Sequence, residues 1–72
     1  MDRVYIIFEG CQHESEYPIS EAHTNLAMAT ADLEGRIEGW GYTKRIEPET
    51  GEITYDKGPD YVYIRSFDVI VG

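Results

Sequence analysis

The chain has a single cysteine among its 72 residues, so no disulfide can form within it. One free thiol suits a reducing compartment, and we expect a cytoplasmic protein. The opening residues, MDRVYIIFEG, lack the basic segment, apolar run and small-residue cleavage site of a signal peptide. No uninterrupted apolar stretch approaches the roughly 20 residues that cross a bilayer. These absences predict a protein that is not held in a membrane.

Basic residues are also scarce: six lysines and arginines stand against fourteen aspartates and glutamates, which gives a net charge of −8. Such a charge repels nucleic-acid phosphates and anionic membranes, and it speeds encounter with basic proteins. We therefore expect no direct nucleic-acid binding and no membrane binding. Two interpretations of the acidity stay open. It keeps a small protein soluble, or it lets the protein compete with nucleic acid for a basic groove.

Motifs of common enzymes and nucleotide-binding proteins are missing. The glycines on either side of Trp40 form neither GxxxxGK[ST] nor GxGxxG. Cys11, His13 and His23 have zinc chemistry, but structural zinc sites usually contain paired ligands such as two nearby cysteines. We expect no catalytic residue, no metal site and no cofactor. A metal- or thiol-dependent protein built on Cys11, His13 and His23 is the alternative.

A strand and a helix are indicated in the first half of the chain. Residues 4–8, VYIIF, form a short β-branched and aromatic run that is typical of a buried strand. The polar stretch CQHESEYP that follows is a loop or a short edge strand. Ser20 is a good helix N-cap. Gly35 ends the predicted helix, or the helix continues to Glu38 and Gly39 ends it. The residues expected on its buried face are Ala22, Leu26, Ala29 and Leu33.

Three strands joined by tight turns are predicted in the second half. Residues 40–46 alternate with period two, and the stretch EPETGE after them has the proline and glycine of a hairpin turn. The returning arm is 52–55, the next turn is 56–60, and the last strand is 61–72. Consecutive strands with tight turns pair antiparallel. The prediction is a single α+β domain over residues 1–72, with a mostly antiparallel sheet of about four strands and one helix on one face, in the order β-α-β-β-β.

The last strand, YVYIRSFDVIVG, is apolar on both sides. Tyr61, Tyr63, Phe67, Val69 and Val71 point one way, and Val62, Ile64 and Ile70 point the other. One short helix covers only one face of a sheet, so the second apolar face needs another cover. Three interpretations stay open: loops or curvature hide it, another copy of the chain covers it, or a different protein does.

Aromatic residues suggest what the uncovered face does, because tyrosine and tryptophan are enriched at binding hot spots. The sequence therefore favours a small acidic protein-binding module without catalytic activity, whose partner is another protein with a basic surface. A homodimer of unknown structural role is an alternative. The expected anchors are Tyr5, Trp40, Tyr42, Tyr61 and Tyr63, and the carboxylates expected to steer a basic partner are Glu47, Glu49 and Glu52.

The stretch VYIIFEG, followed by a polar turn and a helix that begins SEAHTNLA, resembles small, largely uncharacterised proteins encoded by phages and prophages. The resemblance covers residues 4–10 and 20–33. It implies a phage context, hence the cytoplasm of a host cell, and no particular activity. It favours inhibitors of host defence or of nucleic-acid-handling proteins, as anti-restriction and anti-CRISPR proteins are. The tail beyond the helix departs from the pattern.

Overall fold

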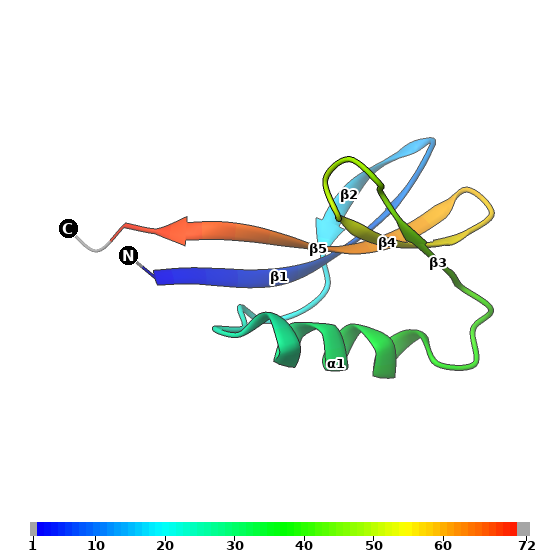
Figure 1. The fold of residues 1–72 in the computed structure, drawn as a ribbon. Helices are drawn as coiled ribbons and strands as arrows, with labels where there is room; N and C mark the ends of the chain where they lie inside the picture. Colours follow the sequence, from blue (N-terminus) through cyan, green and yellow to red (C-terminus); the bar gives the residue numbers. More distant parts are fainter. Residues whose placement is uncertain (1, 71–72) are drawn as a thin grey trace.

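A computed structural model describes residues 2–70, which form one antiparallel sheet with a single helix on one face (Figure 1). The elements in chain order are β1 (Asp2–Cys11), β2 (Glu14–Pro18), α1 (Leu26–Ile37), β3 (Thr43–Ile46), β4 (Ile53–Lys57) and β5 (Asp60–Val69). Across the sheet the order is β2-β1-β5-β4-β3, and every neighbouring pair is antiparallel. The predicted α+β class is confirmed, with five strands in place of about four.

The additional strand is β2, in the stretch that the sequence left open between a loop and an edge strand. β1 extends beyond the predicted residues 4–8 and continues to Cys11, and the chain then turns back into β2. Pro18 ends β2, which is tolerated because an edge strand has one side that needs no N–H donor. The element order is therefore β-β-α-β-β-β, and the predicted order β-α-β-β-β is wrong in this one place.

The helix begins later than predicted, because Asn25 and not Ser20 is its N-cap. The Asn25 side-chain oxygen accepts hydrogen bonds from the backbone N–H groups of Ala27 at 2.7 Å and Met28 at 3.2 Å. These two amides have no partner inside the first helical turn, so Asn25 satisfies them.

Ser20 instead ties the segment before the helix to the edge of β1. Its hydroxyl accepts the backbone N–H of Ile7 at 2.9 Å and donates to the backbone oxygen of Glu21. Tyr5 and His23 exchange two backbone hydrogen bonds of 2.7 and 2.8 Å a few residues further on. An extended segment that pairs with β1 cannot also be helical, which is why the cap moves to Asn25.

The far end of α1 follows the longer of the two predicted alternatives. The helix passes through Gly35 and ends at Ile37, with Glu38 as C-cap and Gly39 at φ 79°. A positive φ is costly for any residue with a Cβ, so a glycine is required there. Of the predicted buried face, Ala29 and Leu33 are buried, whereas Leu26 is exposed and Ala22 precedes the helix.

The remaining strands are shorter than predicted. β3 starts at Thr43, because Gly39 and Gly41 both have positive φ and place Trp40 in a turn. The turns around Gly51 and Gly58 confirm the two predicted hairpins, with φ of 74° and 60°. The alternation predicted for the last strand holds through β5, while Val71 lies outside the described residues.

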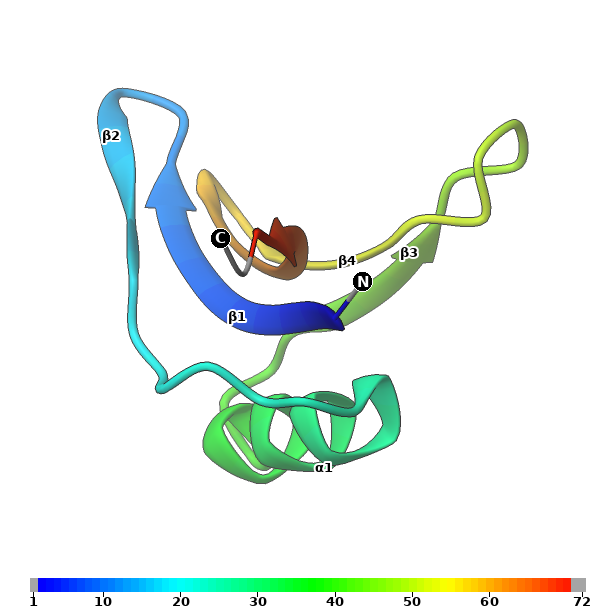
Figure 2. The same cartoon turned by 90° about the vertical axis from the view of Figure 1, so that its left-hand side faces the viewer.

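The core lies between α1 and the sheet. Ile7, Leu33, Tyr55 and Val62 form a buried cluster, with Ala29 also buried. Partly buried apolar side chains surround it: Ile19, Ile37, Tyr42 and Ile64. Seen along the strands, the sheet curves away from the helix, and the face opposite α1 lies on the inside of the curve (Figure 2). Within residues 2–70, the buried cluster therefore lies on one side of the sheet.

Candidate protein-binding surface

The sheet face opposite α1 carries a continuous set of large side chains. Residues directly opposite each other in an antiparallel pair share a face. The register pairs Val4 with Phe67, and Phe8 with Tyr63. We call this surface the open face, and its side chains are Val4, Ile6, Phe8, Glu16, Tyr61, Tyr63, Arg65 and Phe67.

No helix, strand or loop within residues 2–70 lies over the open face (Figures 1 and 2). Its apolar side chains are half-buried, and Phe67 is 38% exposed. Every buried side chain of the sheet, namely Ile7, Tyr55 and Val62, lies on the other face. One helix thus covers one face, as the sequence suggested, and the described part of the chain does not cover the second.

The aromatic rings of the open face contact one another in a row. The centre of the Phe8 ring lies 6.2 Å from that of Tyr63 and 6.1 Å from that of Phe67. The ring centres of Tyr61 and Tyr63 lie 6.1 Å apart, and all three pairs are tilted. Tilted and edge-on ring pairs at such distances are mutually attractive. The guanidinium of Arg65 lies 4.8 Å from the centre of the Phe8 ring, within cation–π distance. The rings therefore hold fixed positions without a partner.

Glu16 joins this row to the sheet edge. Its carboxylate accepts hydrogen bonds from the Tyr63 hydroxyl at 2.7 Å and the Tyr61 hydroxyl at 3.1 Å, and it forms an ion pair with Arg65. Glu16 is on β2 and its three donors are on β5, so the contacts cross over β1. The edge strand is held in the curve of the sheet by side chains as well as by its backbone.

Gly10 makes this crossing sterically allowed. It pairs with Tyr61 across β1 and β5, and an alanine Cβ at position 10 would lie 2.6 Å from both Cζ and the hydroxyl oxygen of Tyr61. The same Cβ would lie 3.0 Å from the Cβ of Glu16. Such a ring lying over a cross-strand glycine replaces the side chain that the glycine lacks. The Tyr61–Glu16 contact therefore requires glycine at position 10.

The electrostatics of the cluster keep Glu16 ionised. The Tyr63 hydrogen bond lowers the pKa of Glu16 against the opposing effect of desolvation, and Tyr61 and Arg65 lower it further. Burial, followed by the bond to Glu16, raises the pKa of Tyr63 to about 12 and raises that of Tyr61 as well. A carboxylate with a lowered pKa and three donors is a poor general base. The geometry favours a structural role for Glu16.

The predicted tyrosine anchors fall on both sides of the sheet. Tyr61 and Tyr63 lie together on the open face. Tyr5 shares the helix-side face with Ile7, and Tyr42 packs against the core on that side. Tyr5 and Tyr42 are thus separated from Tyr61 and Tyr63 by the sheet itself.

Trp40 and the three predicted carboxylates lie in two further places. Trp40 is 62% exposed in the turn after α1. Glu47, Glu49 and Glu52 surround the β3–β4 turn, where Glu47 lies 3.7 Å from Arg45. The predicted set of eight is therefore not one contiguous surface.

Sequence reasoning missed Phe8, Glu16 and Arg65 as members of the open face. The period-two pattern carried a signal for Phe8, which alternates with Ile7 in the first strand. Nothing local marked Glu16 among fourteen carboxylates, because its partners come from a strand more than forty residues away in sequence.

The residues of the metal alternative are not gathered. Among residues 2–70, no three side chains from histidine, cysteine, aspartate and glutamate lie close enough to hold a metal ion. His23 Nε2 instead lies 2.8 Å from the Asp32 carboxylate, which also accepts from Arg36 at 2.9 Å. These contacts lower the pKa of Asp32, the His23 bond most strongly.

No helix within the described residues is long and apolar enough to cross a membrane.

The cations of the protein are largely engaged by its own carboxylates. All four arginines form ion pairs: Arg3 with Asp68, Arg36 with Asp32, Arg45 with Asp56 and Glu47, and Arg65 with Glu16. Nine of the fourteen carboxylates have no lysine, arginine or histidine partner within residues 2–70. Lys44 and Lys57 form no ion pair within these residues, so the charge left for a partner to meet is nine carboxylates against two lysines.

Comparisons with protein-family models, with curated proteins and with solved structures find no match to this chain.

Proposed function

We propose that this protein is a non-enzymatic protein-binding module whose open face docks onto a partner with a basic surface. The observation that carries the proposal is the row of aromatic rings on a face that no described element covers. Large apolar patches on small proteins mark interaction sites, and tyrosine suits them because its ring buries area while its hydroxyl keeps a polar partner.

The contacts within the open face support this role. Tyr61 and Tyr63 are held by Glu16 and by each other, so they lose little conformational freedom when a partner arrives. Binding costs less when the contacting side chains are already ordered. Their hydroxyls are satisfied internally, so what these residues offer a partner is the flat surface of their rings.

The charge of the molecule indicates the class of partner. With arginines engaged by internal ion pairs, the unpaired carboxylates attract a basic surface and speed its approach. Proteins that handle nucleic acid carry such surfaces in order to hold phosphates. We infer an inhibitor that occupies the nucleic-acid groove of such a protein, which agrees with the phage context that the sequence resemblance implies.

Two tyrosine variants test the proposal. Tyr63→Ala removes a ring from the centre of the open face, and Tyr17→Ala removes an exposed ring from the helix-side face of edge strand β2. Each variant, fused to an affinity tag, is used to capture a partner from a host lysate, and the identified partner is then titrated in purified form.

The expected result is a loss of affinity of about tenfold or more for Tyr63→Ala and little change for Tyr17→Ala. Thermal melts of both variants measure the accompanying loss of stability. Equal losses of association and folding for Tyr63→Ala would count against the proposal. Analytical ultracentrifugation in the absence of a partner tests the homodimer, which would appear as a reversible dimer that Tyr63→Ala dissociates.

A further inference from the structure

Strand β5 has a free backbone edge over much of its length. It pairs with β1 from end to end, from Asp60 to Val69, but β4 pairs only with its first residues, up to Tyr63. On the side of β4, residues 64–69 have no neighbouring strand within the described part of the chain. In Figure 1 this segment is the ribbon of β1 and β5 that extends beyond the rest of the sheet.

The free edge of β5 differs from the two outermost strands of the sheet. Proteins protect exposed edges with short strands, lysines and prolines, because unpaired N–H and C=O groups pair readily with another chain. β2 has only five residues and ends in Pro18, and β3 has four residues and includes Lys44. Residues 64–69, IRSFDV, contain no proline and run for about 20 Å. Their two charged side chains, Arg65 and Asp68, are engaged in ion pairs within the protein. This edge is long and less protected than the other two.

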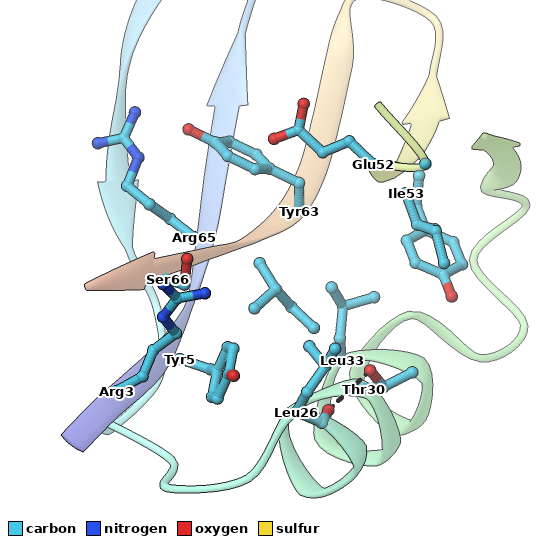
Figure 3. A pocket seen from close by; sticks show the side chains of 13 residues that line it. Arg3, Tyr5, Leu26, Thr30, Leu33, Glu52, Ile53, Tyr63, Arg65 and Ser66 are labelled. Carbon is cyan, nitrogen blue, oxygen red and sulfur yellow. Dashed lines mark hydrogen bonds between the residues drawn. The ribbon is translucent and has the colours of Figure 1, made fainter. Parts of the chain in front are cut away.

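A pocket of about 530 Å³ opens beside this edge at the start of β4, beyond which β5 has no neighbour on that side within the described residues (Figure 3). Its floor on the helix side is apolar, with Leu26 and Leu33 of α1 below Ile53 (Figure 3). Ile64 of β5 also lines it. Leu26 is 52% exposed, although it occupies a helix face that otherwise turns to the core. The pocket is therefore shaped for an apolar side chain that projects from a strand lying beside β5.

Glu52 supplies the charge at the end of the pocket. It extends from the start of β4 on the side of Tyr63 (Figure 3) and has no cationic partner within residues 2–70. The nearby cations are engaged, Arg3 by Asp68 and Arg65 by Glu16. A lysine or arginine on the incoming strand, opposite its apolar face, would meet Glu52.

We propose that the free edge of β5 takes an extended segment of a basic partner as a sixth strand, with alternate side chains apolar toward α1 and cationic toward Glu52. Main-chain hydrogen bonds to residues 64–69 supply affinity, and the pocket supplies specificity for the apolar positions. This inference rests on the proposed protein-binding function and adds the segment of the partner that is recognised. A second copy of the chain is a weaker occupant, because two copies that each carry a net charge of −8 repel one another.

The probe that tests this is a labelled hexapeptide of alternating lysine and valine, with blocked ends, titrated against the whole protein by fluorescence anisotropy. A control peptide of the same sequence is N-methylated at every amide, which keeps its charge and leaves neither edge able to donate main-chain hydrogen bonds. The expected result is binding of the first peptide, with new hydrogen-exchange protection confined to residues 64–69, and a loss of about tenfold or more for the second.

Matched variants separate the pocket from general attraction. Leu26→Asp places a charge in the pocket, whereas Met28→Asp places the same charge on an exposed part of the same helical turn that does not line it. Aspartate is tolerated at both positions because it lies near the helix N-terminus. Added negative charge alone would strengthen binding of a cationic peptide, so a loss for Leu26→Asp and none for Met28→Asp is expected. Likewise, Glu52→Gln weakens binding and Glu49→Gln does not.

Three results would overturn the proposal: no binding of the alternating peptide, equal binding of the N-methylated peptide, or equal effects of Leu26→Asp and Met28→Asp. Protection of residues 64–69 in the peptide-free protein, together with a dimer in ultracentrifugation, would assign the edge to a second copy. The proposed function fails separately. If Tyr61→Ala no longer binds a captured partner and Leu26→Asp still binds it, the result supports the open face as the binding surface and rejects the β5 edge.

Discussion

Replacing Gly10 by alanine tests the geometry of the open face, because the same change at Gly35 should have the opposite effect. An alanine Cβ at position 10 would lie 2.6 Å from the far end of the Tyr61 ring, closer than such atoms approach in proteins. At Gly35, inside α1, a Cβ meets no atom within 4 Å. One methyl group is added in each case, so a difference in outcome reflects only the surroundings.

The magnitudes follow from known costs. Overpacking a filled site costs about 1–3 kcal/mol, and Tyr61 can swing outward, so the lower end applies. Alanine also reduces the freedom of the unfolded chain, which stabilises by roughly 0.4–1 kcal/mol. After this offset we expect Gly10→Ala to lose about 0.5 kcal/mol. We expect Gly35→Ala to gain about 0.5–1 kcal/mol, since glycine is unfavourable within a helix. For a domain of this size each kcal/mol moves Tm by about 4–8 °C.

Thermal melts and urea unfolding measure both variants, and NMR contacts between Tyr61 and Glu16 report the position of the ring. The expected result is a lower Tm and the loss of these contacts in Gly10→Ala, with a higher Tm and intact contacts in Gly35→Ala. A Gly10→Ala protein as stable as Gly35→Ala, with the contacts unchanged, would refute the placement of Tyr61 over Gly10.

Three further predictions concern titration and capping. The pKa of Tyr63 in the folded protein, about 12, lies above its ordinary value of 10.0, so the stability that Tyr63 contributes is present below pH 10 and is lost as the pH rises toward 12. Ultraviolet titration of the protein against Tyr63→Phe should show one tyrosine that ionises late. Full ionisation of Tyr63 by pH 10 would contradict this prediction. The pKa of Glu16 in the folded protein lies below its ordinary 4.5, so the stability that Glu16 contributes is present above pH 4.5 and is lost as the pH falls through the pKa in the folded protein. Glu16→Gln should remove this part of the pH dependence of Tm, which thermal melts at acidic pH measure. Asn25→Ala should lower the free energy of unfolding in urea by about 1 kcal/mol. A larger loss of helix for Ser20→Ala than for Asn25→Ala would indicate that Ser20 is the N-cap.

The sequence predicted the parts of the fold that depend on local pattern. The period of the apolar residues identified the helix face of Ala29 and Leu33 and the two sides of β5. The stretch EPETGE and residues 56–60 predicted two turns, and the structure has Gly51 and Gly58 at positive φ in them. These signals lie within a few residues of one another, so they can be recognised without knowing which strands pair.

Long-range pairing decided what the sequence could not. Ser20 has the side chain of an N-cap, but its hydroxyl accepts the backbone N–H of Ile7 in β1. Asn25 caps the helix instead. Glu16 became the centre of the open face only because β2 and β5 flank β1. The sequence predicts both Tyr5 and Tyr63 as anchors, whereas the register puts them on opposite faces of the sheet.

The pairing of β1 with β5 has a consequence for how the protein is made. The middle strand of the sheet, β5, and its neighbour β1 come from the two ends of the described chain. A ribosome that has released only the segment up to β4 has released strands that lack their central neighbour. Closing so long a loop is slow, since its entropy is lost before any pairing compensates. The nascent chain should therefore stay unfolded, and exposed to chaperones and proteases, until β5 has left the exit tunnel.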